Sequence, residues 1–225
     1  KMWHALRRDG IDIGREQTAR LMRLAGVSGK GKGGAPITTR KAHVPDLRPD
    51  LVEREFKAQS PNKLWVADIT YVRTKKGFVY AAFVTDVYSR RIVGWALSDS
   101  MRTEALPLQA LNQAIVCAEE TTGLIHHSDH GSQYVSVVYN ERLSQHGIAA
   151  STGTVGDSYD NALAENINGS YKNELIHTRR WNDVVDVEIA TFEWVSWWNE
   201  ARLPLKAWDT EPRPRLKPNF GNRTR

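Results

Sequence analysis

The chain has 225 residues, of which 40% are hydrophobic and 25% are charged, and its formal net charge is +5. This length suits one large domain, or a medium domain with a small one. The single cysteine, Cys117, excludes an internal disulfide and the usual structural zinc clusters. No apolar run approaches the ~20 residues of a membrane-spanning helix, so we expect a soluble intracellular protein with no membrane partner.

The charge is unevenly distributed along the chain. Residues 1–50 contain 11 Lys and Arg against 5 Asp and Glu, and residues 201–225 contain 7 against 2. The stretch between them is net acidic. Basic ends around an acidic middle indicate a polyanion-binding protein with carboxylates in its core, although solubilising tails explain the pattern equally well.

Two short helices are expected at the start of the chain, over residues 2–9 and about 15–25. Gly26 follows the second helix, at the usual position of a C-cap glycine. Two helices joined by a glycine-containing turn resemble a helix-turn-helix segment. Any small helical hairpin would give the same pattern.

Three arginines of the second helix, Arg15, Arg20 and Arg23, lie outside its apolar face and are candidate DNA contacts. We assign residues 1–29 to this helical, DNA-binding-like segment and expect it to be truncated, because the chain does not begin with Met. Residues 30–60 follow, and their Gly, Lys and Thr content predicts a basic linker.

Beyond residue 60 the pattern changes to strands rich in β-branched and aromatic residues. The first three strands are separated by turns short enough for antiparallel pairing. Helices then alternate with strands, which is the element order of the ribonuclease-H-like α/β fold, a five-stranded mixed sheet flanked by helices. The expected strands are 63–72, 77–88, 91–97, 124–128 and 148–152, and the expected helices are 102–120, 132–147, about 158–176 and 184–202.

Three carboxylates stand out in this part of the chain. Asp68 lies in the first strand, whose two faces are both largely apolar, so its carboxylate must be hydrogen-bonded, protonated or bound to a cation. For a single strand aspartate taken alone, a satisfied structural contact is the commoner explanation. Asp129 ends the fourth strand, and Glu165 lies in a later helix.

The fold's strand order would bring Asp68 and Asp129 together. Close carboxylates raise each other's pKa unless a cation neutralises them. With Glu165 they would form an oxygen-rich site suited to Mg²⁺ or Mn²⁺ and not to zinc. Two such ions can activate the attacking oxygen and stabilise the leaving oxygen of a phosphodiester.

Four ordered motifs make a family resemblance specific: "WVADITYV", "VTDVYSRRIVGWAL", "HHSDHGSQY" and "YDNALAEN…YKNEL". Over roughly residues 15–200 the chain resembles DDE transposases of the insertion sequence 3 family, the second-reading-frame product, which are related to retroviral integrases. The resemblance implies that Asp68, Asp129 and Glu165 are the catalytic, metal-binding triad. It also implies that this triad binds two metal ions, Mg²⁺ or Mn²⁺. The 35 residues between the last two agree with the family's spacing.

The same resemblance implies an integrase-type catalytic core over residues 61–202 and an irregular basic tail over 203–225. It implies metal-dependent DNA cleavage and strand transfer for an insertion sequence. The expected partners are terminal inverted repeats and target DNA, further copies of the chain, and a first-reading-frame product, separate or fused. We expect it in the bacterial cytoplasm, associated with the nucleoid. A nuclease on the same fold and an inactive DNA-binding remnant are the alternatives.

Other residues near the motifs are open to more than one interpretation. Lys172 shares a helix face with Glu165 and is a candidate contact to the DNA backbone, although a solvated lysine is an equal alternative. His126, His127 and His130 suggest a zinc site, but they are crowded on one segment without a nearby cysteine. The proline-containing tail departs from the family pattern, which predicts a frameshifted or truncated end.

Overall fold

A computed structural model describes residues 2–29, 48–53, 55–99, 106–118, 120–153 and 162–202. At its centre is a five-stranded sheet with the order β3-β2-β1-β4-β5. The first three strands pair antiparallel, whereas β4 runs parallel to both β1 and β5. The mixed sheet predicted from the sequence is therefore confirmed. The strands are β1 (Leu64–Thr74), β2 (Gly77–Asp86), β3 (Ile92–Ser98), β4 (Ile125–Ser128) and β5 (Ala149–Thr152).

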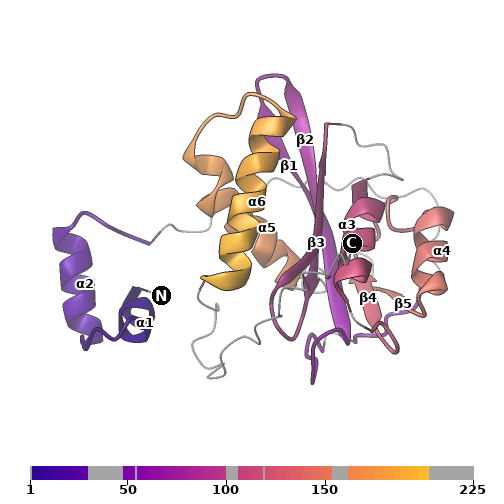
Figure 1. Ribbon diagram of the computed structural model, residues 1–225, viewed down its shortest axis with the longest axis horizontal. Coiled ribbons are helices and arrows are strands. Elements are labelled where there is room, and N and C mark those ends of the chain that lie inside the picture. Colours follow the sequence, from indigo (N-terminus) through magenta and orange to yellow (C-terminus); the bar gives the residue numbers. More distant parts are fainter. Residues whose placement is uncertain are drawn as a thin grey trace, which may run out of the picture.

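Helices cover both faces of this sheet, as Figure 1 shows. On one face Trp65 and Ala67 of β1 pack into the cluster formed with α3 and α4. On the other face Val72 packs with the apolar side chains of α5 and α6. The alternation of side chains along β1 thus makes it a central strand that is buried from both sides. The helices are α3 (Leu106–Cys117), α4 (Val137–Gln145), α5 (Ala162–Glu174) and α6 (Val184–Glu200).

β1 is much longer than its parallel neighbour β4. The register pairs Leu64–Ala67 of β1 with Ile125–Ser128 of β4. β1 therefore continues from Asp68 past the carboxyl end of β4. In α/β sheets such ends of parallel strands are where ligands bind, because the loops that follow diverge there.

The helices around the sheet are shorter than the sequence pattern predicted, as α4 and α5 illustrate. The helix expected over 132–147 begins at Val137, because the Ser136 hydroxyl accepts a hydrogen bond from the backbone N–H of Tyr139 and caps the helix. Before it, the Tyr134 N–H donates to the Gly131 carbonyl in a turn. The helix expected to reach residue 176 ends at Glu174 and is followed by η1 (Ile176–Thr178), a short 3-10 helix.

The N-terminal residues form two helices, α1 (Met2–Arg8) and α2 (Arg15–Leu24), close to the predicted ranges. Trp3 joins them: its indole N–H donates to the Ile13 carbonyl at 2.7 Å, and the Arg15 guanidinium lies over its ring. A DNA-binding role for this pair stays a prediction. Residues 30–47 of the expected linker and the whole tail 203–225 fall outside the described residues. Among the helices that the structure does describe, none is long and apolar enough to cross a bilayer.

Gly94 on β3 is a tight contact between the sheet and α3, and Gly94→Ala tests it. A Cβ there would lie 2.0 Å from the Ala110 carbonyl oxygen and 2.9 Å from the Ala114 Cβ. We expect the free energy of unfolding in urea to fall by about 1–3 kcal/mol. The control is Gly169→Ala in α5, where the new Cβ would meet nothing within 4 Å. This substitution should raise the free energy of unfolding by about 0.5–1 kcal/mol. Equal effects of the two substitutions would contradict this packing.

Candidate active site

Asp68 in β1 and Asp129 directly after β4 lie next to each other at the carboxyl end of β4. Ala67 pairs with Ser128, so the two aspartates are the next residue on each chain segment. Burial raises the pKa of Asp68 from 3.8 to about 7, and the Asp129 carboxylate is the next cause of that rise. Glu165 raises it further, as the smallest contribution. The structure therefore brings the first two predicted carboxylates together at a partly buried position.

Two hydrogen bonds orient the Asp68 carboxylate. The Ile69 backbone N–H donates to Oδ1 at 2.8 Å, and the Asn168 side-chain amide of α5 donates to Oδ2 at 2.8 Å. Both favour the charged form and lower the pKa, yet together they do not offset burial and Asp129. The carboxylate is thus fixed in position while its negative charge remains poorly compensated.

Asp129 is held through its own loop and through a distant arginine. The Gly131 N–H donates to Asp129 Oδ1 at 2.9 Å, closing a turn directly after β4. Arg48 donates to the Ser128 hydroxyl at 2.7 Å and to the Asp129 backbone carbonyl at 3.0 Å. The main chain that presents the second carboxylate is therefore clamped from outside the sheet.

Arg48 was not among the residues predicted from the sequence. It lies in the stretch assigned to the linker, and a single arginine among basic residues carries no local signal. Val52, a little further on, packs into a small cluster with Leu64 and Val66 of β1. The linker boundary at residue 60 stays a prediction, but the described residues 48–53 lie against the sheet.

Glu165 projects from the first turn of α5 and is solvent-exposed. Asn168, one turn later on the same helix, is buried and ties α5 to β1 through Asp68. Its Oδ1 is also buried, and no atom of the described residues hydrogen-bonds to it. Within the parts of the chain that the structure describes, no three His, Cys, Asp or Glu side chains converge into a metal-binding group. Glu165 thus lies near Asp68 and Asp129, but the three carboxylates do not form a metal-binding group among the described residues.

The pair nevertheless fits a hard divalent cation by its chemistry. Carboxylate oxygens are the donors that Mg²⁺ and Mn²⁺ prefer. The raised pKa of Asp68 records negative charge that the surrounding protein does not compensate, and a cation between Asp68 and Asp129 would compensate it. The donor set does not suit zinc, which favours nitrogen and sulfur ligands.

Of the predicted DNA contacts, only Lys172 lies near the carboxylates. Its Nζ lies 4.5 Å from the centre of the Tyr71 ring. Burial lowers the pKa of Lys172, and the charge of Asp68 raises it. Arg15, Arg20 and Arg23 are exposed on α2, which Figure 1 shows to one side of the sheet and its helices.

The three histidines of the motif have separate partners. His126 lies 3.0 Å from the Tyr139 hydroxyl, and burial lowers its pKa to about 3, so it is neutral. His127 lies 3.0 Å from the Ser151 hydroxyl, and His130 contacts the Gly153 carbonyl. They support the end of the strand and do not form a zinc site.

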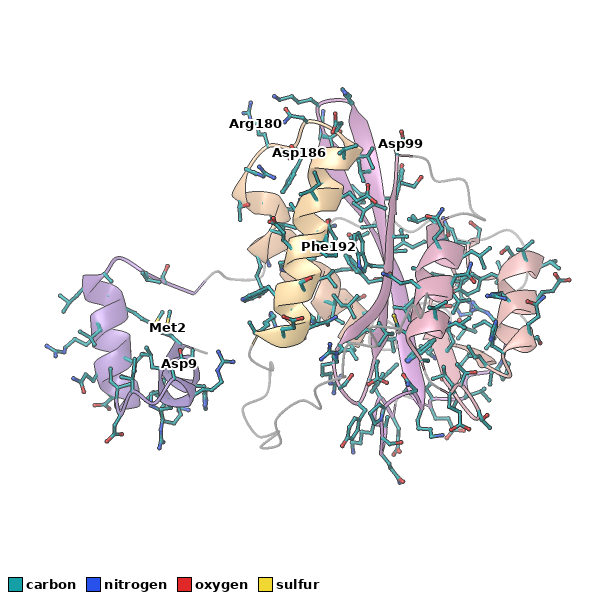
Figure 2. The ribbon with its side chains drawn as sticks, in the orientation of Figure 1. Met2, Asp9, Asp99, Arg180, Asp186 and Phe192 are labelled. Atoms are coloured by element: carbon teal, nitrogen blue, oxygen red, sulfur yellow. The ribbon has the colours of Figure 1, made fainter. Side chains whose placement is uncertain are left out.

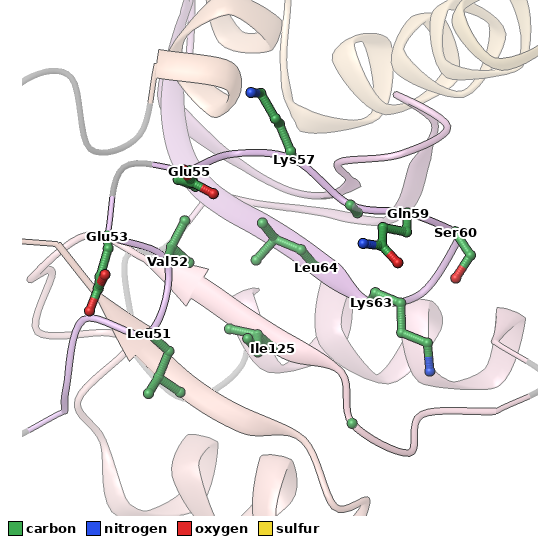
Figure 3. A pocket seen from close by; sticks show the side chains of 12 residues that line it. Leu51, Val52, Glu53, Glu55, Lys57, Gln59, Ser60, Lys63, Leu64 and Ile125 are labelled. Carbon is green, nitrogen blue, oxygen red and sulfur yellow. The ribbon is translucent and has the colours of Figure 1, made fainter.

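A groove lies at the opposite end of the same two strands (Figure 3). Leu64 and Ile125, which begin the pairing of β1 with β4, form part of its wall. Leu51, Lys57 and Lys63 line it as well. Because the aspartates lie beyond the other end of this pairing, the groove is separate from the carboxylate pair.

Comparison with known proteins gives consistent matches. Two integrase core domain models match residues 58–158 and 146–203. The transposase for insertion sequence element IS629 of Shigella sonnei is 48% identical over 214 residues, covering 94% of this chain and 71% of that protein. The transposase for insertion sequence element IS904 of Lactococcus lactis subsp. lactis is 34% identical, covering 88% and 78%. Transposase InsF for insertion sequence IS3A of Escherichia coli is 35% identical, covering 76% and 59%.

Solved structures with this fold include integrase and transposase cores. The HTLV-2 integrase catalytic core domain in complex with magnesium, in its trimeric form, has a TM-score of 0.52 at 20% identity, covering 66% of this chain and 93% of that chain. The catalytic domain of Mos1 mariner transposase has a TM-score of 0.50 at 11% identity, covering 60% and 70%. These likenesses support the ribonuclease-H-like fold.

The raised pKa of Asp68 predicts a pH dependence of stability without metal. Its folded pKa of about 7 exceeds its usual value of 3.8, so the stability present at low pH is lost as pH rises through 7. Between pH 4.5 and pH 8 in EDTA, the free energy of unfolding of wild type should fall by on the order of 1–3 kcal/mol more than that of Asp68→Asn. Urea unfolding across that range measures the difference.

Asp129→Asn serves as the matched control for this titration. It removes the second-largest cause of the raised pKa, so the loss of stability should occur at lower pH than in wild type. Parallel pH profiles for wild type and Asp68→Asn would contradict the account.

Proposed function

The chain belongs to the insertion sequence 3 family of DDE transposases, and we propose that Asp68, Asp129 and Glu165 are its catalytic carboxylates. It is a transposase of the polynucleotidyl transferase type, built on an integrase core domain. The observation that carries the residue assignment is that Asp68 and Asp129 each directly follow the last pair of the β1–β4 register, Ala67 with Ser128. The pKa of Asp68 is raised by burial and then by the Asp129 carboxylate. Glu165 enters the proposal through its place on α5, which is tied to Asp68 by Asn168.

The proposed reaction has two phosphoryl-transfer steps and no covalent link between protein and DNA. In the first, water attacks a phosphodiester at the end of the element and releases a 3′-hydroxyl. In the second, that hydroxyl attacks another phosphodiester, displaces the 3′-oxygen of the attacked strand as a new 3′-hydroxyl, and so joins the two strands. Such chemistry rests on positioning and on charge stabilisation by the site.

We propose that the carboxylates hold Mg²⁺ or Mn²⁺, as two ions in the active complex. Integrase-type cores are metal-dependent, and one related core was solved with magnesium. When bound, such ions supply a Lewis acid that activates the attacking oxygen and stabilises the leaving oxygen. Asp68 and Asp129 are the pair best placed to share an ion, and Glu165 would join them.

The residues around the carboxylates act by fixing their positions. Asn168 and the Ile69 N–H orient Asp68, while Arg48 clamps the main chain at Asp129. A site held in this way loses little orientation freedom when substrate binds, which favours in-line transfer.

The proposed partners follow from the family and from the basic side chains. Terminal inverted repeats and target DNA are the substrates, within the bacterial cytoplasm at the nucleoid. Lys172 would contact the DNA backbone near the cut, and Arg15, Arg20 and Arg23 would contact DNA further away.

The active complex would contain several copies of the chain, because two DNA ends must be joined. It would also contain a first-reading-frame product, as a separate partner or a fusion. The catalytic core would span residues 61–202.

Cutting and joining of a labelled terminal-repeat duplex in Mg²⁺ is the direct test of this function. We expect nicked and joined products from wild type in Mg²⁺ or Mn²⁺, none in EDTA, and at least a hundredfold less from Asp129→Asn, a loss in the range of known preorganised electrostatic groups. Cutting without joining would indicate a nuclease. Retained DNA binding without cutting, after the first-reading-frame product has been added, would indicate an inactive remnant.

Lys172→Ala tests the backbone contact separately from catalysis. The logarithm of DNA affinity falls linearly with the logarithm of salt concentration. If Lys172 contacts one phosphate, the slope of that line should be less steep by about 0.9 in Lys172→Ala than in wild type. Lys172→Arg should restore the slope, whereas Lys63→Ala at the other end of β1 should leave it unchanged. Fluorescence anisotropy from 50 to 200 mM salt gives the slopes. An unchanged slope in Lys172→Ala would remove the residue from the interface.

A further inference from the structure

A cluster of exposed basic residues lies where β1 turns into β2. We call Arg73, Lys75, Lys76, Arg179 and Arg180 the hairpin-tip patch. Its two sequence segments are joined by a bridge between Thr74 and Trp181 and by a hydrogen bond of 3.0 Å from the Lys75 N–H to the Trp181 carbonyl. Figure 2 shows Arg180 and Asp186 at this end of the molecule. Backbone contacts therefore hold the two segments of the patch together.

The patch keeps a net positive charge after its ion pairs are counted. Lys76 pairs with Asp183 at 2.9 Å, and Arg179 pairs with Asp186 at 3.1 Å. Five cations against these two carboxylates leave a charge of +3. Among the described residues, neither Arg73 nor Arg180 has an ion pair or a hydrogen bond from its side chain. Exposed ion pairs are weak, so all five cations are available to an anionic partner.

Three contacts connect the patch to the carboxylate pair. The contact nearest the carboxylates is the hydrogen bond from Asn168 to Asp68. Further along β1, Lys172 lies over the Tyr71 ring. At the end of the strand, Trp181 pairs with Thr74. The segment from α5 through η1 therefore runs beside β1 in the same direction. Lys172 lies between the carboxylates and the patch, so positive charge continues along this path.

The length of the path suits duplex DNA. At about 3.3 Å per strand residue, Arg73 and Lys75 lie roughly 16 and 23 Å from Asp68 along β1. With base pairs about 3.4 Å apart, these distances correspond to roughly five to seven base pairs. A duplex with its reacting phosphate at the carboxylates would therefore reach the patch within one helical turn.

We propose that the hairpin-tip patch binds the phosphate backbone of the DNA whose reacting phosphate lies at Asp68 and Asp129. The proposal rests on the proposed function and extends it by naming a second, sequence-independent DNA contact. Such contacts set the register of a duplex without reading its bases. The patch would thereby align the scissile phosphate with the carboxylates from a distance.

The double variant Arg73→Gln/Arg180→Gln tests this contact without removing any described intramolecular interaction. Its matched control is Lys57→Gln/Lys63→Gln, which removes two exposed cations beside the groove at the opposite end of β1. Melting temperatures establish that both variants remain folded. Anisotropy with a 30-base-pair duplex between 50 and 200 mM salt then gives the affinity and its salt dependence.

If the patch binds two phosphates through these arginines, the log–log slope should fall by about 1.8, with roughly tenfold weaker binding at low salt. The control should keep a slope within about 0.3 of wild type, a tolerance small against one phosphate contact. An equal fall in both variants would mean a general charge effect, and no fall in the patch variant would mean a merely solvated surface. Either result overturns the proposal.

The position of the DNA on the patch is tested by tethering. On a Cys117→Ser background, Arg180→Cys is linked by disulfide to duplexes that carry a thiol tether at successive phosphates. We expect the highest yield roughly five to seven base pairs from the scissile phosphate. A yield that is flat along the duplex would overturn the proposed path.

Failure of this inference is distinguishable from failure of the proposed function. A wild type that cuts DNA, together with an unchanged slope in Arg73→Gln/Arg180→Gln, would overturn the patch alone. A wild type that binds but does not cut, with a reduced slope in the variant, would retain the patch and overturn the catalytic proposal.

Discussion

Two carboxylates on neighbouring parallel strands repel each other, and the arrangement of this molecule depends on keeping them together. The register of β1 and β4 sets Asp68 beside Asp129 whatever their charge state, because the pairing is fixed by the buried residues that precede them. Burial then strengthens the repulsion by removing water. The fold thereby creates a local demand for positive charge, which appears as the raised pKa of Asp68.

The surrounding elements hold this unfavourable pair in place from three directions. α5 contacts Asp68 through Asn168, the turn after β4 contacts Asp129 through Gly131, and Arg48 clamps the strand end from an earlier part of the chain. None of these contacts places a full positive side-chain charge between the two carboxylates. Among the described residues, the Asp68 carboxylate is thus held rigidly while its charge stays incompletely compensated, as expected where a cation and a phosphodiester belong together.

Much of this could be predicted from the sequence. The β-branched and aromatic runs predicted the strands, and the element order of the ribonuclease-H-like fold predicted that β4 would lie beside β1. The two largely apolar faces of the strand that contains Asp68 correctly predicted a strand covered on both sides. The extent of the helices was less predictable, because a Ser136 side chain that caps α4 depends on the turn before it, which no periodicity reveals.

Long-range polar contacts were the part that the sequence could not supply. Arg48 meets Asp129 across 81 positions, and nothing in its local surroundings distinguishes it from a solvated linker residue. The basic residues after η1 acquire meaning only when Trp181 pairs with Thr74 and brings them to the β1–β2 turn. Both features arise from tertiary packing, which pattern and propensity do not encode.

The most direct test of the central claim is a crystal structure of the full chain with Mn²⁺, with the ion located by its anomalous scattering. We expect an ion bound by both Asp68 and Asp129, with Glu165 as the third protein ligand, and no ion there in Asp68→Asn. Mn²⁺ bound only elsewhere, with the two carboxylates left to hydrogen bonds within the protein, would contradict it.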